Sequence, residues 1–496
     1  MSLAIVHTRA CLGVEAPPVT VEVHLSNGLP GLAIVGLPEA AVKESKDRVR
    51  SALLNSHLEF PARRITVNLA PADLPKEGGR YDLAIAMGIL AASGQIPCDT
   101  LSQYEFIGEL ALSGQLREVK GILPAALACH KAGRRLIVAH ENGGEAALAG
   151  NRDTLIADNL LRVCAHLHNR EHLHFAQLPH DLSPPAPPEL ADVRGQEHAK
   201  RALEVAASGG HNLLMYGPPG TGKTMLASRL PGILPPIEMR DAMDIAAVYS
   251  VSGSLAPAWR QRPFRAPHHT ASAPALVGGG SNPQPGEISL AHGGVLFLDE
   301  LPEFQRHVLE VLREPMESGE VRIARARAQT RYPARFQLIA AMNPCPCGYF
   351  GDNDSRCHCT PDQVRRYRGK ISGPLLDRID LHVPIAAVLP TELHKAPPGE
   401  SSKVVQQRVN KARGIALTRQ GKSNSELSAK EIEQYCQLSD TDHSFLARAV
   451  EKLNLSTRAY HRVLKVARTL ADMTNSEQIE RPQLAEALSF RGLDRG

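Results

Sequence analysis

A glycine-rich segment in the middle of the chain has the residue types and spacing of a phosphate-binding loop. Residues 217–224 read GPPGTGKT, follow an apolar run at 212–216 and precede a stretch with helical spacing. In that strand–loop–helix setting, backbone N–H groups and the helix N-terminus can face nucleotide phosphates, while Lys223 reaches the terminal oxygens and Thr224 suits Mg²⁺. The residues expected to bind the nucleotide are Gly217, Pro218, Pro219, Gly220, Thr221, Gly222, Lys223 and Thr224.

A second apolar run ends in two carboxylates. Val295–Leu298 has the composition of a buried strand, and Asp299 and Glu300 follow it directly. At the end of a strand, Asp299 suits Mg²⁺ coordination and Glu300 suits polarising the attacking water. The sequence contains no N-K-x-D guanine signature. We therefore predict an ATPase that uses Mg²⁺.

Length and composition limit what can position these residues. The chain has 496 residues, enough for about three domains, with 43% apolar and 22% charged residues, a globular balance. No run of 18 or more apolar residues predicts a membrane span, so no membrane partner is expected. A poor signal peptide and nine cysteines favour a reducing, cytoplasmic location. The net charge of +4 and the 4% aromatic content do not by themselves indicate a nucleic-acid-binding protein. Evidence for nucleic-acid binding must therefore come from local basic patches.

Two proline-rich stretches divide the chain. Residues 179–190 read PHDLSPPAPPEL, which favours an extended, semi-rigid spacer, and a second break lies at 390–402. We expect an N-terminal domain at 1–178, a linker at 179–190, a nucleotide-binding core at 191–389 and a C-terminal helical domain at 400–496.

Several motifs of the middle unit together resemble the magnesium-chelatase-like AAA+ ATPases, and within them the ComM group. Besides the phosphate-binding loop, they are VRGQ at 193–196, FRAPHHTASAPALVGGG at 264–280, PGEISLAHGGVLFLDELPEF at 285–304, AAMNPCPCG at 340–348 and SGPLLDRIDLHV at 372–383. The resemblance implies an α/β fold, an AAA+ phosphate-loop ATPase core with a helical lid. It also implies a ring, usually a homo-hexamer, with ATP bound between subunits.

The resemblance assigns roles to three further residues. Asn343 matches the sensor that helps to orient the attacking water, Arg378 matches the arginine finger that reaches a neighbour's γ-phosphate, and Arg458 matches the second sensor on the lid. Arginine suits a site where negative charge develops, because it stays charged and binds oxygens in a fork.

For Arg378 and Arg458, a structural role is the alternative to a catalytic one. Arg378 lies close in sequence to Asp377 and Asp380 and could form an ion pair with either of them. Arg458 belongs to a basic helix face that could point to solvent or contact DNA. That face also holds Arg462, Lys465 and Arg468.

The N-terminal unit resembles the Lon-protease-type domain, an α+β fold, over residues 65–95. Where the protease pattern reads P-K-D-G-P-S-A-G, this chain reads PKEGGRYD at 75–82, so Arg80 occupies the nucleophile's position. The catalytic lysine's position aligns with Leu123. A serine nucleophile cannot act without its hydroxyl and its base, so we expect no peptidase activity. Without peptidase activity, the N-terminal unit could act in ring assembly or in DNA engagement.

Four of the nine cysteines lie within fifteen positions. Cys345 and Cys347 form one C-x-C pair, and Cys357 and Cys359 form the other. Two close pairs of thiolates could complete a tetrahedral zinc site, with His358 as an alternative ligand. The other interpretation is free thiols that stabilise a loop or respond to redox conditions.

Two basic segments are candidates for phosphate contacts with DNA. Residues 319–335 partly alternate apolar residues with arginines, which predicts a hairpin with one basic face. The second segment, at 365–370, could equally be a solvated helix end. The candidate DNA-binding residues are Arg322, Arg325, Arg327, Arg365, Arg366, Arg368 and Lys370.

Two functions follow from these patterns and the resemblance. The first is an ATP-driven hexameric motor on single-stranded and branched DNA, similar to the branch-migration helicases that promote integration of incoming DNA in natural transformation. The alternative is a chelatase-type ATPase that remodels a protein partner without DNA. Arg80 and Leu123 disfavour a third function, a proteolysis-linked regulator.

Overall fold

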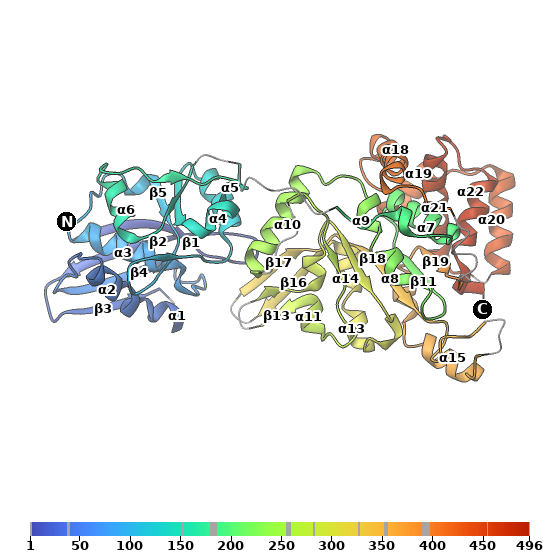
Figure 1. The fold of residues 1–496 in the computed structure, drawn as a ribbon, viewed down its shortest axis with the longest axis horizontal. Helices are drawn as coiled ribbons and strands as arrows, with labels where there is room; N and C mark the ends of the chain where they lie inside the picture. Colours follow the sequence, from blue (N-terminus) through green and yellow to red (C-terminus); the bar gives the residue numbers. More distant parts are fainter. Residues whose placement is uncertain are drawn as a thin grey trace.

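The computed structural model is an elongated molecule with the two ends of the sequence at its two ends (Figure 1). The N-terminal unit lies at one end, the central sheet in the middle and the C-terminal helices at the other end. The structure describes residues 2–36, 40–150, 153–178, 186–253, 259–280, 283–325, 328–351, 356–387, 397–453 and 455–495. Within these residues, no helix has the length and apolar character needed to cross a membrane.

The N-terminal unit is built on an eight-stranded mixed sheet in the order β10-β9-β8-β5-β1-β2-β4-β3. β1 and β2 are antiparallel, as are β2 and β4, whereas β1, β5, β8 and β9 are mutually parallel. In β2, every second residue is buried, which places one face of the strand on the core. The strands are β1 (Leu3–Arg9), β2 (Pro18–Ser26), β3 (Gly31–Val35), β4 (Arg64–Ala70), β5 (Tyr104–Phe106), β8 (Arg135–Ala139), β9 (Thr154–Ala157) and β10 (His174–Phe175).

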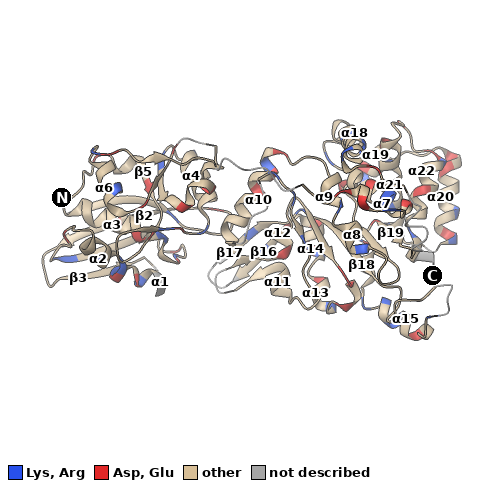
Figure 2. Ribbon diagram, viewed as in Figure 1, with Lys and Arg blue, Asp and Glu red and all other residues tan. Residues whose placement is uncertain are grey.

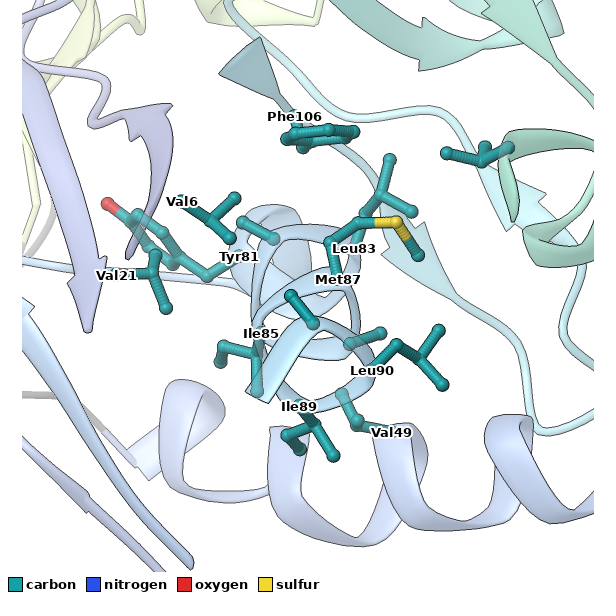
Figure 3. Packing of buried hydrophobic residues seen from close by; sticks show 14 of the residues in the cluster. Val6, Val21, Val49, Tyr81, Leu83, Ile85, Met87, Ile89, Leu90 and Phe106 are labelled. Atoms are coloured by element: carbon teal, nitrogen blue, oxygen red, sulfur yellow. The ribbon is translucent and has the colours of Figure 1, made fainter. Parts of the chain in front are cut away.

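A completely buried helix forms the centre of this unit. α3 (Asp82–Ala92) packs on β1 and β2 with one side and faces α2 (Ser45–Asn55) with another, as Figure 3 shows around Val6, Val21 and Val49. Its sequence is apolar on all sides, which is typical of a helix with no solvent-facing stripe. Gly88 lies against Val23, where a Cβ would come within 2.5 Å of the valine side chain.

The central unit contains a five-stranded parallel sheet in the order β12-β15-β18-β11-β19. Its strands are β11 (Leu213–Tyr216), β12 (Phe264–Arg265), β15 (Val295–Leu298), β18 (Gln337–Met342) and β19 (Leu381–Pro384). β15 and β18 are buried at every position, as expected for inner strands of a parallel sheet that is covered on both faces. The strands predicted at 212–216 and 295–298 are therefore confirmed, as is the strand that precedes Asn343.

The C-terminal helices share one apolar core with this sheet. Buried residues of α7 (Glu197–Gly209), β11 and β19 form a single cluster with those of α21 (Thr457–Met473) and α22 (Arg481–Ser489). α18 (Ser402–Gln420) packs on both α7 and α21. Two shorter helices, α19 (Ala429–Tyr435) and α20 (Asp440–Lys452), complete the bundle. The helices and the sheet are therefore packed as one body, and a movement of the helices would disturb the packing of β11 and β19.

Several contacts join the N-terminal unit to the central unit, at a helix and at a hairpin. The amide of Gly121, just before α4 (Ile122–Lys131), donates a 3.0 Å hydrogen bond to the Ser250 carbonyl near the end of α10 (Met239–Ser252). Gly13 lies against the hairpin of β16 (Glu320–Arg325) and β17 (Ala328–Pro333), where a Cβ would approach the Thr330 methyl to 2.3 Å. The predicted hairpin is thus present, and the N-terminal unit touches it. Residues 179–185, most of the predicted linker, lie outside the described part of the chain.

Candidate functional site

Three loops with the predicted nucleotide-site residues meet at one edge of the parallel sheet. Their strands run in the same direction, with Tyr216 paired to Met342 and Leu298 paired to Ala340. The residues that follow these strands are therefore neighbours across the edge. The amide of Gly217 donates a 3.2 Å hydrogen bond to Met342, one residue before Asn343. Ligands of parallel α/β sheets bind outside this carboxyl edge.

The phosphate-binding loop holds Lys223 in a fixed position. α8 (Lys223–Ala227) begins after Gly222, whose φ of 83° is a left-handed conformation that favours glycine. The Lys223 ammonium donates 2.8 Å hydrogen bonds to the carbonyls of Gly217 and Pro218, and a 3.3 Å bond to the side chain of Asn343. Burial lowers the pKa of this lysine, while the Asp299 and Glu300 charges oppose that shift. Asn343, the residue predicted to be the sensor, and Lys223 are thus in direct contact.

Thr224 and Asp299 provide a set of oxygen ligands that suits Mg²⁺. The Thr224 hydroxyl donates a 2.7 Å hydrogen bond to Asp299, whose other oxygen accepts a 2.9 Å bond from the Glu300 amide. Mg²⁺ prefers hard oxygen ligands and commonly takes one or two from the protein and the rest from phosphate and water. The two residues therefore fit the ion that their sequence pattern predicts.

Glu300 has an unusual backbone and a partner that sequence reasoning did not assign. Its φ of 53° and ψ of 44° are left-handed, which is uncommon outside glycine and often marks functional positions. The Glu300 carboxylate lies 3.0 Å from Nδ1 of His269. His269 follows β12, the neighbour of β15, and its ring packs beside His268 with centroids 4.1 Å apart. The pairing of these two strands brings His269 to the glutamate.

Arg378 and Arg458 lie together in another place. Both line one cavity with Glu317 and Asp377, and its described lining includes no residue of the phosphate-binding loop. Arg378 forms an ion pair with Glu317 and donates a 2.6 Å hydrogen bond to the Pro374 carbonyl. The suggested pairing of Arg378 with Asp377 or Asp380 is therefore wrong. Its actual partner is 61 positions away in sequence.

Asp380 belongs instead to a buried network between β19 and α21. It forms an ion pair with Arg462 and accepts a 3.1 Å hydrogen bond from His211, whose other ring nitrogen lies 2.7 Å from the Thr469 hydroxyl. Burial alone would raise the pKa of Asp380, but the Arg462 charge and the His211 bond hold that pKa well below its ordinary value. The network ties the helical bundle to the start of β19.

The basic face suggested for residues 458–468 is mostly internal. Arg468 is buried and paired with Asp472, and the Lys465 ammonium donates a 2.8 Å bond to the Ser425 carbonyl. Arg462 pairs with Asp380 as described above. Only Arg458 among the four has a largely exposed side chain, at 69%, and it lies 4.0 Å from Asp377. The alternative of a solvent-facing or DNA-contacting stripe is thus wrong for the other three, because Asp472, Asp380 and the Ser425 carbonyl bind them.

The four clustered cysteines come together as the sequence suggested. Their sulfur atoms all lie within 4.8 Å of one another, and no described histidine, aspartate or glutamate joins them. His358, the alternative ligand, is exposed and outside the group. Thiolates in such a cluster can bind a metal such as zinc.

The hairpin presents a short basic face. Val321 and Ile323 are buried, whereas Arg322 is exposed and lies directly opposite Arg331, which is also exposed. Arg322 forms an ion pair with Glu320. Arg327 and the side chain of Arg325 lie outside the described part of the structure. Arg331 is thus a further basic residue of this face, besides the candidate DNA-binding residues predicted from the sequence.

The second basic segment is divided between protein contacts and solvent. It lies on α15 (Pro361–Arg368) and the turn after it. Arg368 donates a 3.2 Å hydrogen bond to the Pro344 carbonyl, and Lys370 pairs with Glu303 at 3.2 Å. Arg365 and Arg366 are exposed, although Arg365 is paired with Asp362. α15 has an acidic residue in its first turn and basic residues in its last turn, and Figure 2 shows both signs on this helix.

The two N-terminal positions compared with the protease pattern are both buried. Leu123 lies at the start of α4 with no exposed surface, and Arg80 is 6% exposed. One guanidinium nitrogen of Arg80 donates a 3.3 Å hydrogen bond to the Lys120 carbonyl. Neither side chain provides a nucleophile or a base at this place.

Sequence reasoning assigned no role to His269, Glu317 or Arg331. A signal existed for His269, because it lies in the FRAPHHTASAPALVGGG segment at 264–280, one of the motifs that carry the family resemblance. Arg331 continues the basic pattern of the hairpin into its second strand. No local pattern could reveal the pairing of Glu317 with Arg378, which depends on the tertiary fold.

Three family models match the chain. Residues 189–393 match "Magnesium chelatase, subunit ChlI", residues 21–142 match "Subunit ChlI of Mg-chelatase", and residues 399–491 match "Magnesium chelatase, subunit ChlI C-terminal". Together they match most of the chain.

Curated relatives match over its full length. "Competence protein ComM" of Haemophilus influenzae is 55% identical over 503 residues, covering 100% of this chain and 98% of that protein. The Escherichia coli protein YifB is 55% identical over 498 residues with the same coverage. The magnesium-chelatase 38 kDa subunit of Rhodobacter capsulatus is 29% identical over 174 residues, which is 31% of this chain and 49% of the subunit.

Proposed function

The chain belongs to the ComM and magnesium-chelatase-like AAA+ ATPase family, and we propose that it is an ATP-driven motor acting on single-stranded and branched DNA. The relative from Haemophilus influenzae carries the name competence protein. By analogy, the proposed biological role is branch migration during natural transformation, which would promote integration of an incoming single strand.

The convergence of Lys223, Asp299, Glu300 and Asn343 at one sheet edge is the observation that supports ATP hydrolysis. Lys223 would neutralise β- and γ-phosphate oxygens, and Thr224 and Asp299 would hold Mg²⁺, which supplies charge stabilisation when bound. Glu300 would accept the proton of the attacking water. Asn343 reaches Lys223 and would orient the water beside it.

The placement of Arg378 and Arg458 supports action between subunits. The described lining of their shared cavity includes no residue of the phosphate-binding loop of the same chain. In a hexameric ring, both could reach the nucleotide bound by a neighbour and stabilise the charge that develops there. The ion pair of Arg378 with Glu317 must then open or be shared when the neighbour docks.

Three further parts complete the proposal. The exposed arginines of the β16–β17 hairpin and of α15 would contact DNA phosphates. The four-cysteine cluster would hold zinc in addition to the ATP and Mg²⁺ of the nucleotide site. The N-terminal unit would be a Lon-protease-like domain without peptidase activity, a proposal that Arg80 and Leu123 support. Its contacts with α10 and with the hairpin suit a role in DNA engagement.

A branch-migration and strand-displacement assay with ATP tests the proposal. We expect the parent protein to convert a labelled four-way or three-stranded DNA junction, and the matched Lys223→Ala protein to leave it unchanged. ATP hydrolysis without DNA binding or strand displacement would contradict the DNA motor and favour the protein-remodelling function.

A further inference from the structure

The four-cysteine cluster has the dimensions of a zinc site. The Sγ atom of Cys345 lies 3.3 Å from Cys347 and 3.8 Å from Cys357, and Cys347 lies 3.6 Å from Cys357. Four sulfurs at about 2.3 Å from a zinc ion form a tetrahedron with edges of about 3.8 Å. None of these cysteines is in a disulfide. The sulfurs are thus already spaced for tetrahedral coordination.

The first cysteine pair forms a turn that rests on the phosphate-binding loop. The Gly348 amide donates a 3.0 Å hydrogen bond to Cys345, and Gly348 has a φ of 89°. A Cβ at this position would lie 2.8 Å from Cδ of Pro219, so no side chain fits between the turn and the loop. Pro219 is four residues before Lys223. Cys345 is two residues after Asn343 on the other side of the contact.

The second pair leads directly into α15. Cys359 precedes Thr360, the N-cap residue of that helix, whose hydroxyl accepts a 3.3 Å hydrogen bond from the Gln363 amide in a capping box. From the far end of the helix, Arg368 returns a 3.2 Å bond to Pro344, the residue before Cys345. The cluster therefore closes a compact unit between β18 and α15.

We infer that the four thiolates hold one zinc ion whose role is to clamp the 345–350 turn against the phosphate-binding loop. Residues 352–355, between the two pairs, lie outside the described part of the chain. With zinc bound, the turn keeps Pro219 and the Asn343 segment in place. Without zinc, four thiols must share this space, and like-charged thiolates would repel one another. The inference rests on the proposed function in taking ATP as the ligand of the loop.

Metal analysis and nucleotide binding test the clamp together. We expect the purified parent protein to carry one zinc per chain, measured by mass spectrometry of the metal. The double variant Cys357→Ser with Cys359→Ser should lose the zinc and bind a fluorescent ATP analogue at least several-fold more weakly. Cys98→Ser, which changes a partly buried cysteine of the N-terminal unit, should keep both properties.

A second variant guards against a general loss of folding. Gly348→Ala retains all four cysteines and should still bind one zinc, yet it should bind the ATP analogue more weakly because its Cβ meets Pro219. A zinc-free parent protein would overturn the metal site. Unchanged nucleotide affinity in the zinc-free double variant, or in Gly348→Ala, would overturn the clamp. Failure of the parent protein to bind ATP would instead contradict the proposed function, while its zinc content would still decide the metal site.

Discussion

His269 and Glu300 follow two neighbouring parallel strands, β12 and β15, and Nδ1 of the histidine lies 3.0 Å from the glutamate carboxylate. The glutamate follows Asp299 in a left-handed backbone conformation, and its carboxylate is paired with this histidine. We therefore predict that His269 is a positioning residue, which would hold the carboxylate that accepts the proton of the attacking water. The same strand pairing places that carboxylate beside the segment that follows β12.

Replacing His269 with alanine should lower kcat for ATP hydrolysis and leave KM nearly unchanged. The histidine is not part of the loop expected to bind the nucleotide, whereas we expect the direction of Glu300 to depend on it. His269→Asn places an amide near the position of Nδ1 and should recover part of the rate. Steady-state hydrolysis rates over a range of ATP concentrations measure both constants. A raised kcat in His269→Ala would show that the contact restrains Glu300 and would contradict the positioning role.

Lys223→Ala and Glu300→Gln should both abolish turnover, for different reasons. The lysine holds phosphate oxygens, so its loss should weaken ATP binding as well as the chemical step. The glutamine keeps the size of Glu300 but cannot accept a proton, so this variant should bind ATP and retain it unhydrolysed. Nucleotide binding and single-turnover hydrolysis distinguish the two outcomes. Hydrolysis by Glu300→Gln at the parent rate would refute the assignment.

Arg378→Ala should bind ATP normally but hydrolyse it about 10³-fold more slowly, the scale of a lost arginine finger. If the arginine serves a neighbouring subunit, mixing this variant with Lys223→Ala should restore some activity, because a mixed ring contains an interface with both residues intact. Hydrolysis rates as a function of the mixing ratio provide the measurement. No recovery in rings that demonstrably exchange subunits would assign Arg378 to its own chain.

The nucleotide edge could be predicted from sequence because each part of it is encoded locally. Val295–Leu298 is an uninterrupted apolar run, and the structure contains β15 at those same residues. The glycine pattern of the loop specifies its own turn, and Asn343 directly follows a second apolar run. Parallel pairing of these strands then brings the three loops together without further information.

The arginine partners could not be predicted because they depend on contacts between distant segments. Arg378 has two acidic neighbours in sequence, but the fold presents Glu317 to it instead. Asp380, one of these two neighbours, is bound instead by His211, which precedes β11, and by Arg462 of the helical bundle. One exception was local: Arg468 and Asp472 are four residues apart on a helix and form an ion pair.

His292 should make the protein less stable as the pH falls below 6.5. Burial lowers the pKa of this 5% exposed histidine to about 4, and Nδ1 accepts a 3.0 Å hydrogen bond from the Arg335 amide. The unfolded chain therefore binds a proton at this residue before the folded chain does, so the stabilising difference present above pH 6.5 is lost on acidification. From pH 6.5 to pH 5, this costs about 2 kcal/mol.

Denaturant unfolding at pH 7 and pH 5 measures this effect. His292→Asn retains an acceptor near Nδ1 but cannot titrate, so its loss of stability between the two pH values should be smaller by about that amount. Some pH dependence should remain, because burial also lowers the pKa of His382, to about 3. His57→Asn provides the control, since His57 is exposed and its φ of 56° is one that asparagine tolerates. Equal pH dependence in the parent and His292→Asn proteins would contradict the prediction.

The last prediction concerns the paired arginines of the β16–β17 hairpin. Arg322 and Arg331 are exposed and face each other across the two strands, so a DNA strand that passes this surface could contact both. A motor that moves along DNA should contact phosphates here rather than base edges, because phosphates are the same at every step. Replacing both arginines with alanine should weaken binding equally on unrelated sequences. It should also reduce the slope of log affinity against log salt by about 1.8 on duplex DNA and about 1.4 on single strands.

Binding titrations at several salt concentrations give that slope, and Arg64→Ala, which changes an exposed arginine of β4, serves as the control. Hydrolysis without DNA should stay near the parent rate, since neither arginine belongs to the nucleotide edge. An unchanged slope in intact rings would exclude the hairpin from the DNA path and favour the protein-remodelling function.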